Sequence, residues 1–250
     1  ISFNYARNEN RVIELTPELK EYTVRGRNWA TTIKVVEGGL YNEIFARDIL
    51  KNDAGRVLVN NLGLPVTAPG QTIPQGNMDP DWFGGVSNML SWKGFNLSAL
   101  IDMRMGGRIF SYTECNLTFD GYSEQTLEGR DGMVVNGVQE SDGSENTIQT
   151  TAEAYWHSLG GRNTPIGGAY MYDASYVRLR EILLGYSFRL NSNIIQGIDL
   201  SLYGRNLGFL YNPSEIIDPN MTVGTGNIQG LEGFGVPSAR TYGINARFKF

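Results

Sequence analysis

Hydrophobic and polar residues alternate along the last dozen residues of the chain, 239–250. Apolar side chains occupy every second position and share one face: Tyr242, Ile244, Ala246, Phe248 and Phe250. The positions between them are polar or small, so the period of two predicts a β-strand with one apolar and one polar face. A tilted strand needs roughly 9–11 residues to cross a bilayer, whereas strands of soluble sandwiches more often have about 5–6. The segment is therefore long enough to span a membrane.

Residues 95–105 show the same alternation, and only Leu100 interrupts their polar face. An arginine facing lipid at the midplane would cost about 2–4 kcal/mol, so we expect the polar face to line a water-filled lumen. The predicted lumen-facing residues of the two segments are Asp102, Arg104, Asn245 and Arg247. Lys93 and Gly94 join this segment to the run 84–92, and such a two-residue connection predicts a tight hairpin.

Two longer runs, joined by a short turn at residues 191–196, are less regular: 172–190 and 197–210. The apolar face of residues 182–188 is out of phase with Val177 and Leu179. Either a bulge near Arg180–Glu181 or a change from membrane-embedded to exposed wall would explain the shift. The apolar face of the second run also changes phase along its length.

Two segments near the N-terminus complete a predicted set of seven strands. Residues 1–5 alternate between apolar and polar side chains, and residues 31–45 are interpreted as one extended run. Between them, Thr16 and Pro17 suit an N-cap and a first helical position, so a short helix is predicted over residues 16–21.

The connections between these strands differ in length. The short ones lie near residues 93–94 and 191–196, and the long, structureless ones near residues 46–81, 113–171 and 211–238. Short periplasmic turns and long extracellular loops are typical of outer-membrane barrels. We therefore predict an all-β fold in which residues 1–250 form part of a transmembrane antiparallel β-barrel.

Composition narrows the class further. The chain has 250 residues, a formal net charge of −5, 31 glycines and 13 tyrosines. Many glycines and tyrosines favour strands and turns, and the mildly acidic balance does not favour nucleic-acid binding. The sequence contains no run of about 18 apolar residues, so no transmembrane helix is predicted. The chain begins in the middle of a strand pattern, so we interpret it as a fragment or a processed piece.

Few residues could support catalysis or hold a metal. Cys115 is the single cysteine and His157 the single histidine, so a zinc site or a histidine-based catalytic site is not expected. Residues 151–157 predict a short helix in which His157 packs beside Trp156. The acidic residues near 140–145 lack the spacing of a calcium loop and are interpreted as solvated turns. We predict no enzymatic activity, no cofactor and no metal.

Aromatic residues suggest two further roles. Those in the long loops could stack on a substrate, although they could equally pack the loops or contact a lid: Tyr122, Tyr155, Trp156 and Tyr211. Another group is predicted to form the aromatic girdle at the periplasmic side of the membrane: Trp92, Tyr186, Phe188, Phe248 and Phe250.

Several segments resemble one known family. NMDPDWFGG at residues 77–85, followed by WKGFNLS at 92–98, resembles the N-P-D-W…G-G…(Y/W)-K-G-F-D-L hairpin of SusC/RagA-type TonB-dependent transporters. DASYVRLREILLGYSF at 173–188 is similar to that family's A-S-(F/Y)-V-R-L strand. Shorter similarities occur, in the family's order, at residues 4–12, 204–207 and 237–242.

This resemblance implies a 22-stranded barrel closed around an N-terminal plug, of which the chain supplies about seven C-terminal strands. It implies import of a nutrient, of the glycan or peptide class, across the bacterial outer membrane with energy relayed by TonB. The implied partners are the remaining barrel and plug segment, a SusD-like surface lipoprotein that acts as a lid, TonB through an N-terminal part outside these residues, and the lipid bilayer. Phe250 resembles the terminal aromatic signal for barrel assembly.

Two alternatives remain at this point. The chain could be a smaller stand-alone or oligomeric outer-membrane barrel that acts as a porin or as a binding or structural protein. An enzyme on a barrel scaffold is a third class, which the single histidine disfavours.

Overall fold

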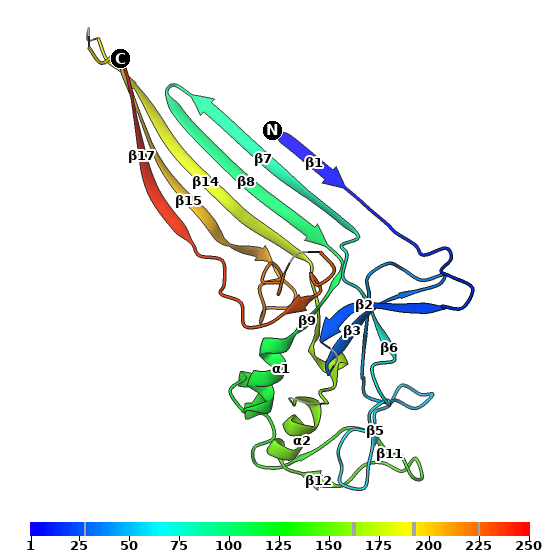
Figure 1. Cartoon of the computed structure of the whole chain (residues 1–250). Coiled ribbons are helices and arrows are strands. Elements are labelled where there is room, and N and C mark those ends of the chain that lie inside the picture. The colour runs from blue at the N-terminus through cyan, green and yellow to red at the C-terminus, as the bar shows by residue number, and fades with distance from the viewer. Residues whose placement is uncertain (28, 162–163, 192–193, 225) are drawn as a thin grey trace.

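A computed structural model describes residues 1–27, 29–161, 164–191, 194–224 and 226–250. Its main element is a six-stranded antiparallel sheet, here called the wall sheet, with the order β1-β7-β8-β14-β15-β17 (Figure 1). Its strands are β1 (Ser2–Ala6), β7 (Trp82–Trp92), β8 (Phe95–Met105), β14 (Tyr176–Arg189), β15 (Gly197–Tyr211) and β17 (Thr241–Lys249). The sheet is open, with β1 and β17 at its edges, so the described residues form part of a wall rather than a closed barrel.

The register of the wall sheet aligns the apolar positions of neighbouring strands. One row crosses five strands through directly opposed residues: Leu90, Leu97, Leu184, Leu202 and Ile244. Every side chain in this row is more than 40% exposed, from 44% at Leu97 to 70% at Ile244. A continuous apolar face that the chain itself leaves uncovered needs an apolar environment, and lipid is the environment that the alternation predicts.

A bulge at Arg180 explains the phase shift noticed in the sequence. The register of β14 slips between Leu179 and Glu181 against both of its neighbours, β8 and β15. The extra residue lets Val177 and Leu179 face the same side as Ile182, because two residues of β14 then lie opposite one residue of the partner strand. The predicted bulge is confirmed.

The two turns of the wall sheet lie at the same end as the C-terminus (Figure 1). Lys93 and Gly94 have φ angles of 47° and 91°. A two-residue hairpin of type I′ needs positive φ at both positions, which confirms the tight hairpin predicted here. The predicted turn at 191–196 joins β14 to β15, although residues 192 and 193 lie outside the described residues.

Two predictions for the N-terminal third are wrong. Residues 31–45 are not one wall strand but a hairpin, β3 (Thr31–Val36) and β4 (Glu43–Ala46), because Gly38 and Asn42 turn the chain with φ angles of 79° and 65°. No helix forms at 16–21; a turn there leads into β2 (Glu21–Arg27). Backbone pairing of β2 with β3 overrides the weak helix-start signal. Six of the seven predicted strands are therefore in the wall sheet.

The long connections are also not structureless, because their described residues fold together into what we call the loop unit: the described part of residues 7–81, 106–175 and 212–240. Strands β2, β3, β4 and β6 (Ile73–Asn77) form one sheet of this unit, and β9 (Arg108–Ser111), β13 (Met171–Asp173) and β16 (Leu231–Glu232) form another. Short pairs join β5 (Leu58–Val59) to β11 (Val138–Gln139) and β10 (Met133–Val134) to β12 (Gln149–Thr150). The helices are α1 (Tyr112–Phe119), α2 (Ala152–Leu159) and the 3-10 turns η1 (Glu124–Leu127) and η2 (Gly167–Tyr170).

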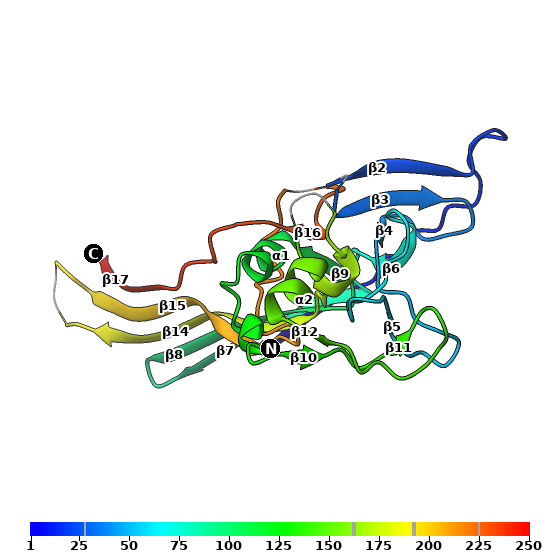
Figure 2. The ribbon, with the colours of Figure 1, turned by 90° about the horizontal axis from the view of Figure 1, so that it is seen from below.

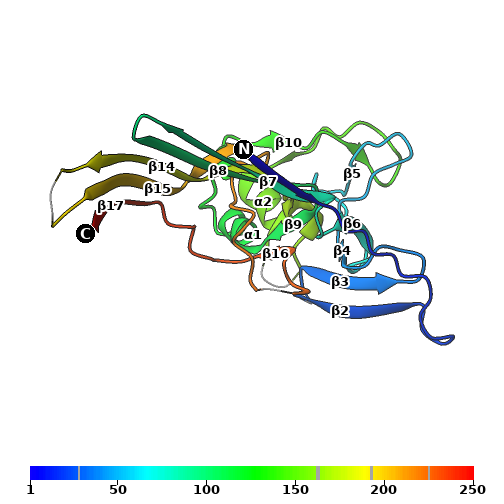
Figure 3. The ribbon, with the colours of Figure 1, turned by 90° about the horizontal axis from the view of Figure 1, so that it is seen from above.

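The loop unit lies at one end of the wall sheet, opposite the turns (Figure 1). Seen from below and from above, the β2–β3 hairpin projects from the loop unit on the side away from β14, β15 and β17 (Figures 2 and 3). One core joins all three connections, since it contains Ala30 from the first, Phe110 and Trp156 from the second, and Leu231 from the third. Burial of these side chains is what orders segments that are far apart in the sequence.

Both helices begin at a side-chain cap. The hydroxyl of Ser111 accepts a hydrogen bond from the backbone N–H of Glu114 at 3.0 Å, and Thr151 caps Ala154 in the same way at 3.1 Å. The helix predicted at 151–157 is thus confirmed, and its capping residue is Thr151. Gly160 ends α2 so close to α1 that a Cβ there would lie 2.9 Å from the Cβ of Phe119, which lets the two helices pack tightly.

Cys115 is expected to be chemically inert in the native protein. Its side chain is fully buried in α1, and this burial raises the pKa of the Cys115 thiol to about 12. Alkylating reagents attack the thiolate, which is scarce at pH 8 when the pKa is raised. We expect N-ethylmaleimide at pH 8 to leave Cys115 unmodified in the folded protein and to label it after denaturation, as read by peptide mass mapping. Rapid native labelling would contradict the described core.

An arginine on the apolar face is expected to be strongly destabilising. Ile244→Arg places a charge in the middle of the exposed apolar row, which should cost about 2–4 kcal/mol if that row faces lipid. The matched control is Asn245→Arg, whose side chain points to the polar face. The measurement is the equilibrium unfolding of the full-length protein in liposomes. Equal stability of the two variants would mean that the row does not face lipid.

Candidate functional site

Ion pairs bridge neighbouring strands across the polar face of the wall sheet. Asp102 on β8 accepts hydrogen bonds from Arg180 on β14, with Nε at 2.7 Å and Nη2 at 2.9 Å, and from the Tyr176 hydroxyl at 3.2 Å. The bulge supplies this contact, because it adds Arg180 to the polar face beside Glu181. Arg104 donates to the carbonyl oxygen of Met78 at 2.6 Å, which ties the wall to the loop unit.

The polar face continues along β15 and β17. Lys249 pairs with Asp199 at 2.8 Å, and Arg205 pairs with Glu181 at 2.6 Å. Asn245 and Arg247 lie opposite Ser201 and Asp199 in the register, on this same face. The structure therefore places the four predicted lumen-facing residues on one polar surface, and their contact with a lumen remains a prediction.

Two aromatic residues of β15 also belong to the polar face, which explains the phase change noticed there. The ring centroid of Phe209 lies 4.3 Å from the guanidinium carbon of Arg178, and the ring centroid of Tyr203 lies 5.0 Å from the guanidinium carbon of Arg205. Cation–π contacts of this kind let an aromatic side chain lie among charged neighbours.

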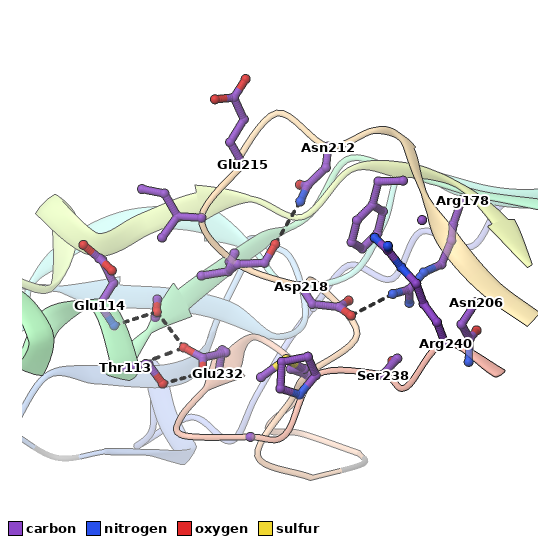
Figure 4. A pocket seen from close by; sticks show the side chains of 18 of the residues that line it. Thr113, Glu114, Arg178, Asn206, Asn212, Glu215, Asp218, Glu232, Ser238 and Arg240 are labelled. Atoms are coloured by element: carbon purple, nitrogen blue, oxygen red, sulfur yellow. Dashed lines mark hydrogen bonds and ion pairs between the residues drawn. The ribbon is translucent and has the colours of Figure 1, made fainter. Parts of the chain in front are cut away.

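A cavity of about 550 Å³ lies where the polar face of the wall meets the loop unit (Figure 4). Residues of both parts line it: Arg178, Asn206 and Phe209 come from the wall, and Thr113, Glu114 and Glu232 from the loop unit. The segment 212–240, which follows β15, supplies Asp218, Ser238 and Arg240. Its size lies in the range of pockets that hold small ligands.

A buried ion pair lies at the cavity wall. Nη2 of Arg178 is 2.8 Å from Oδ2 of Asp218, and the two side chains are only 4% and 10% exposed. Nε and Nη1 of Arg178 have no hydrogen-bond partner among the residues that the structure describes. One carboxylate therefore neutralises the guanidinium group but leaves part of its donor capacity unused.

The carboxylates on the other side of the cavity accept hydrogen bonds from within the protein. Glu232 accepts hydrogen bonds from the hydroxyls of Ser111 at 2.6 Å and Thr113 at 2.5 Å. Glu114 is bonded to Ser123, to Thr118 and, at 2.9 Å, to the amide of Gln125. These bonds link α1, β16 and the turn after α1, so both glutamates hold the loop unit together.

The four predicted loop aromatics do not gather in one place. Tyr122 is 81% exposed in the turn after α1. Tyr155 and Trp156 are neighbours on α2 with their ring centroids 4.9 Å apart, and Trp156 is buried with its Nε1–H 3.3 Å from the carbonyl oxygen of Glu128. Tyr211 is not in a loop but is the last residue of β15. Substrate contact at these residues stays a prediction.

A second, more open cavity of about 720 Å³ lies beside α2, and Trp156 and His157 line it. The ring of His157 stacks on Phe119 of α1, with centroids 4.5 Å apart, a contact that the predicted packing beside Trp156 did not include. Among the described residues, no group of three or more His, Cys, Asp or Glu side chains is arranged to hold a metal ion.

The predicted girdle residues gather at the turn end of the wall sheet, on its apolar face. Tyr186 contacts Phe95 and Phe188 at centroid distances of 4.6 Å each. Phe188 lies opposite Ile198, which lies opposite Phe248 on the last strand. Phe250, the predicted assembly signal, is 79% exposed at this end. In the part of the chain that the structure describes, no helix is long and apolar enough to cross a bilayer.

Sequence signals for the cavity are weak, since its residues come from four separate stretches of the chain: 111–117, 178, 206–221 and 232–240. Arg178 occupies a regular position on the polar face, and nothing local distinguishes it from Arg180. Asp218 lies in a segment that shows no periodicity, and nothing in the alternation of residues 239–250 distinguishes Arg240 as a cavity residue. The pairing of Arg178 with Asp218, forty residues apart, follows only from the fold.

Comparison with known proteins identifies related chains. The chain is 25% identical over 281 aligned residues to TonB-dependent receptor P3 of Formosa agariphila, and the match covers all of this chain and 26% of that receptor. No protein-family model matches the chain. The chain thus spans about a quarter of the length of this relative. The resemblance to TonB-dependent transporters that the motifs indicated is confirmed by this homology.

Solved structures show the same fold. The chain matches part of the RagAB peptide transporter with a TM-score of 0.59 and 18% identity, covering 98% of this chain and 26% of that one. It matches the RagAB peptide importer in its "closed-closed" state with a TM-score of 0.61, 17% identity and the same two shares of coverage, 98% and 26%. The match to the importer in its "open-open" state has a TM-score of 0.54 and 16% identity, and it covers 99% of this chain and 26% of that one.

These comparisons settle two expectations. TonB-dependent receptors reside in the bacterial outer membrane, so the predicted location is confirmed. They are transporters, which agrees with the prediction that the chain is not enzymatic.

Proposed function

We propose that this chain, a homologue of the TonB-dependent receptors, is the C-terminal part of the barrel of an outer-membrane importer. The importer takes up a nutrient of the glycan or peptide class with energy relayed through TonB. The observation that carries the proposal is the two-faced wall sheet, in which an uncovered apolar row backs a face of strand-to-strand ion pairs. A lipid-facing outside and a polar inside are what a transport barrel needs.

The open edges of the wall sheet support a larger barrel. The strands β1 and β17 each have one edge without a partner strand among the described residues. Unpaired backbone groups at membrane depth cost several kcal/mol each, so these edges require partner strands. We propose that the remaining barrel segment supplies them, that residues 46–81, 113–171 and 211–238 lie on the extracellular side, and that a plug fills the lumen.

A lid partner is the second element of the proposal. The structural relatives carry the joint name RagAB, and the importer is known in a closed-closed and an open-open state, which supports a part that moves. We propose a SusD-like lipoprotein that covers the loop unit. The exposed side chains of that unit, including Tyr122, would form part of the contact surface.

The test is nutrient uptake in a strain that produces the full-length protein. We expect deletion of its gene, and separately deletion of the TonB gene, to abolish growth on one glycan or peptide source, and complementation to restore growth. Purification from outer membranes should recover a lipoprotein with the barrel. Uptake that continues without TonB would instead support a porin, and a closed barrel assembled from copies of residues 1–250 alone would reject the proposal.

A further inference from the structure

Positive charge in the cavity between the wall sheet and the loop unit is only partly neutralised. Arg178 has two buried donor nitrogens, Nε and Nη1, that lack a hydrogen-bond partner within the described part of the chain. Arg240 lines the same cavity and forms no ion pair with any described residue. Asp218 is the one carboxylate that pairs with either arginine in the described part of the chain.

Each guanidinium group lies close to one of two neighbouring residues of β15, Gly208 and Phe209. The ring of Phe209 lies 4.3 Å from the guanidinium carbon of Arg178, and a Cβ placed on Gly208 would lie 3.8 Å from Nη2 of Arg240. Asn206 adds an amide that donates to the carbonyl oxygen of Ala239 at 3.3 Å, next to Arg240. Figure 4 shows these polar groups on the side of the cavity away from Glu114.

The carboxylates on the acidic side of the cavity do not form a corresponding site for a cation. Glu114 and Glu232 are buried, and Oε1 of Glu114 and both carboxylate oxygens of Glu232 accept hydrogen bonds from hydroxyl and amide groups of the loop unit. Glu215 is exposed at the rim. The guanidinium group that a ligand can reach directly is thus that of Arg240, whereas Nε and Nη1 of Arg178 are buried and become accessible only when the side chains around them move. A buried donor without an acceptor is unfavourable, which favours such a movement once an anion is bound nearby.

We propose that Arg178 and Arg240 bind a carboxylate group of the transported nutrient, with Asn206 and Ser238 beside it. The proposal rests on the import function and narrows its substrate class to anionic ligands. Guanidinium groups suit planar carboxylates, and such charge-assisted hydrogen bonds are stronger than neutral ones. The carboxylate comes either from the C-terminus of a short peptide or from a uronic acid of a glycan. Because Arg240 is exposed and Arg178 is buried, the ligand meets Arg240 first.

Isothermal titration calorimetry on the purified full-length protein tests the site. The peptide probes are tetra-alanine with a free C-terminal carboxylate and the same peptide with a C-terminal amide. The sugar probes are tri-glucuronic acid and its neutral counterpart, maltotriose. We expect the acidic member of one pair to bind at least tenfold more tightly than its neutral partner, and which pair does so identifies the source of the carboxylate.

The decisive variant is Arg240→Gln, because that side chain is exposed and holds no described partner, so folding should be unaffected. It should weaken binding of the acidic probe about tenfold and leave the neutral probe unchanged. Arg247→Gln, which removes the same charge from the polar face outside this cavity, is the matched control and should change neither affinity. Three results would each overturn the proposed site. They are equal affinities for the acidic and neutral probes, failure of every acidic probe to bind, and an affinity for the acidic probe that Arg240→Gln leaves unchanged. TonB-dependent uptake that persists in that case would leave the import function standing.

Discussion

Asp218→Ala is expected to destabilise the segment after β15 by about 3–5 kcal/mol, because it leaves the buried guanidinium group of Arg178 without its counter-charge. Asp218 also accepts hydrogen bonds from the backbone N–H groups of Met221 and Asn220, through its carbonyl and carboxylate oxygens respectively. The alanine variant keeps the first of these bonds and loses the second. We expect amide hydrogen exchange in residues 212–224 of the full-length protein to become much faster.

Glu215→Ala is the matched control for this prediction. It removes a carboxylate three residues earlier in the same segment, at the rim of the same cavity, with no described ion pair to break. Its effect should stay within about 0.5 kcal/mol, as for most surface substitutions. If Asp218→Ala changes exchange no more than Glu215→Ala does, the Arg178–Asp218 pair does not hold this segment.

Phe110→Ala is expected to loosen the whole loop unit at a cost of about 3–5 kcal/mol. Phe110 is fully buried in the core that joins the three long connections, and its strand pairs with both β13 and β16. Hydrogen exchange should quicken in α1, α2 and β16 together. Exchange in the wall sheet should not change, because its strands are held by their own ladders.

Tyr122→Ala provides the comparison for this second prediction, since it removes an aromatic ring of similar size that is 81% exposed. We expect no change above about 0.5 kcal/mol. Faster exchange confined to β9 in the Phe110 variant would contradict the picture of one shared core and would mean that the three connections open independently.

The wall could be predicted from the sequence because each of its strands repeats a simple local rule. Residues 95–105 alternate with Leu100 as an interruption, residues 241–250 alternate throughout, and the structure pairs both segments within the wall sheet. The bulge at Arg180 could also be recognised in the sequence, because an inserted residue inverts the alternation of apolar and polar residues that follows it. The register then aligns the apolar rows, because a slip of one residue would expose them on the wrong face.

The loop unit could not be predicted in the same way, since its order comes from contacts between distant segments. Ala30, Phe110 and Leu231 share a core although 80 residues or more separate each of them from the next. Residues 31–45 show how local reading fails: both of their strands are apolar enough to suggest one long strand, and only the turn at Gly38 and Asn42 divides them. The cavity was missed for the same reason, because the partners Arg178 and Asp218 meet only after folding.

The central claim is that the wall sheet separates lipid from a polar interior, and spin-label accessibility along β17 tests it most directly. Single labels at residues 242–248 of the full-length protein in liposomes are exposed to oxygen, which partitions into lipid, and to a water-soluble nickel complex. Positions 242, 244, 246 and 248 should be accessible to oxygen and protected from nickel, and the positions between them should show low oxygen accessibility. A profile without this period of two, or nickel accessibility at Ile244, would contradict the account.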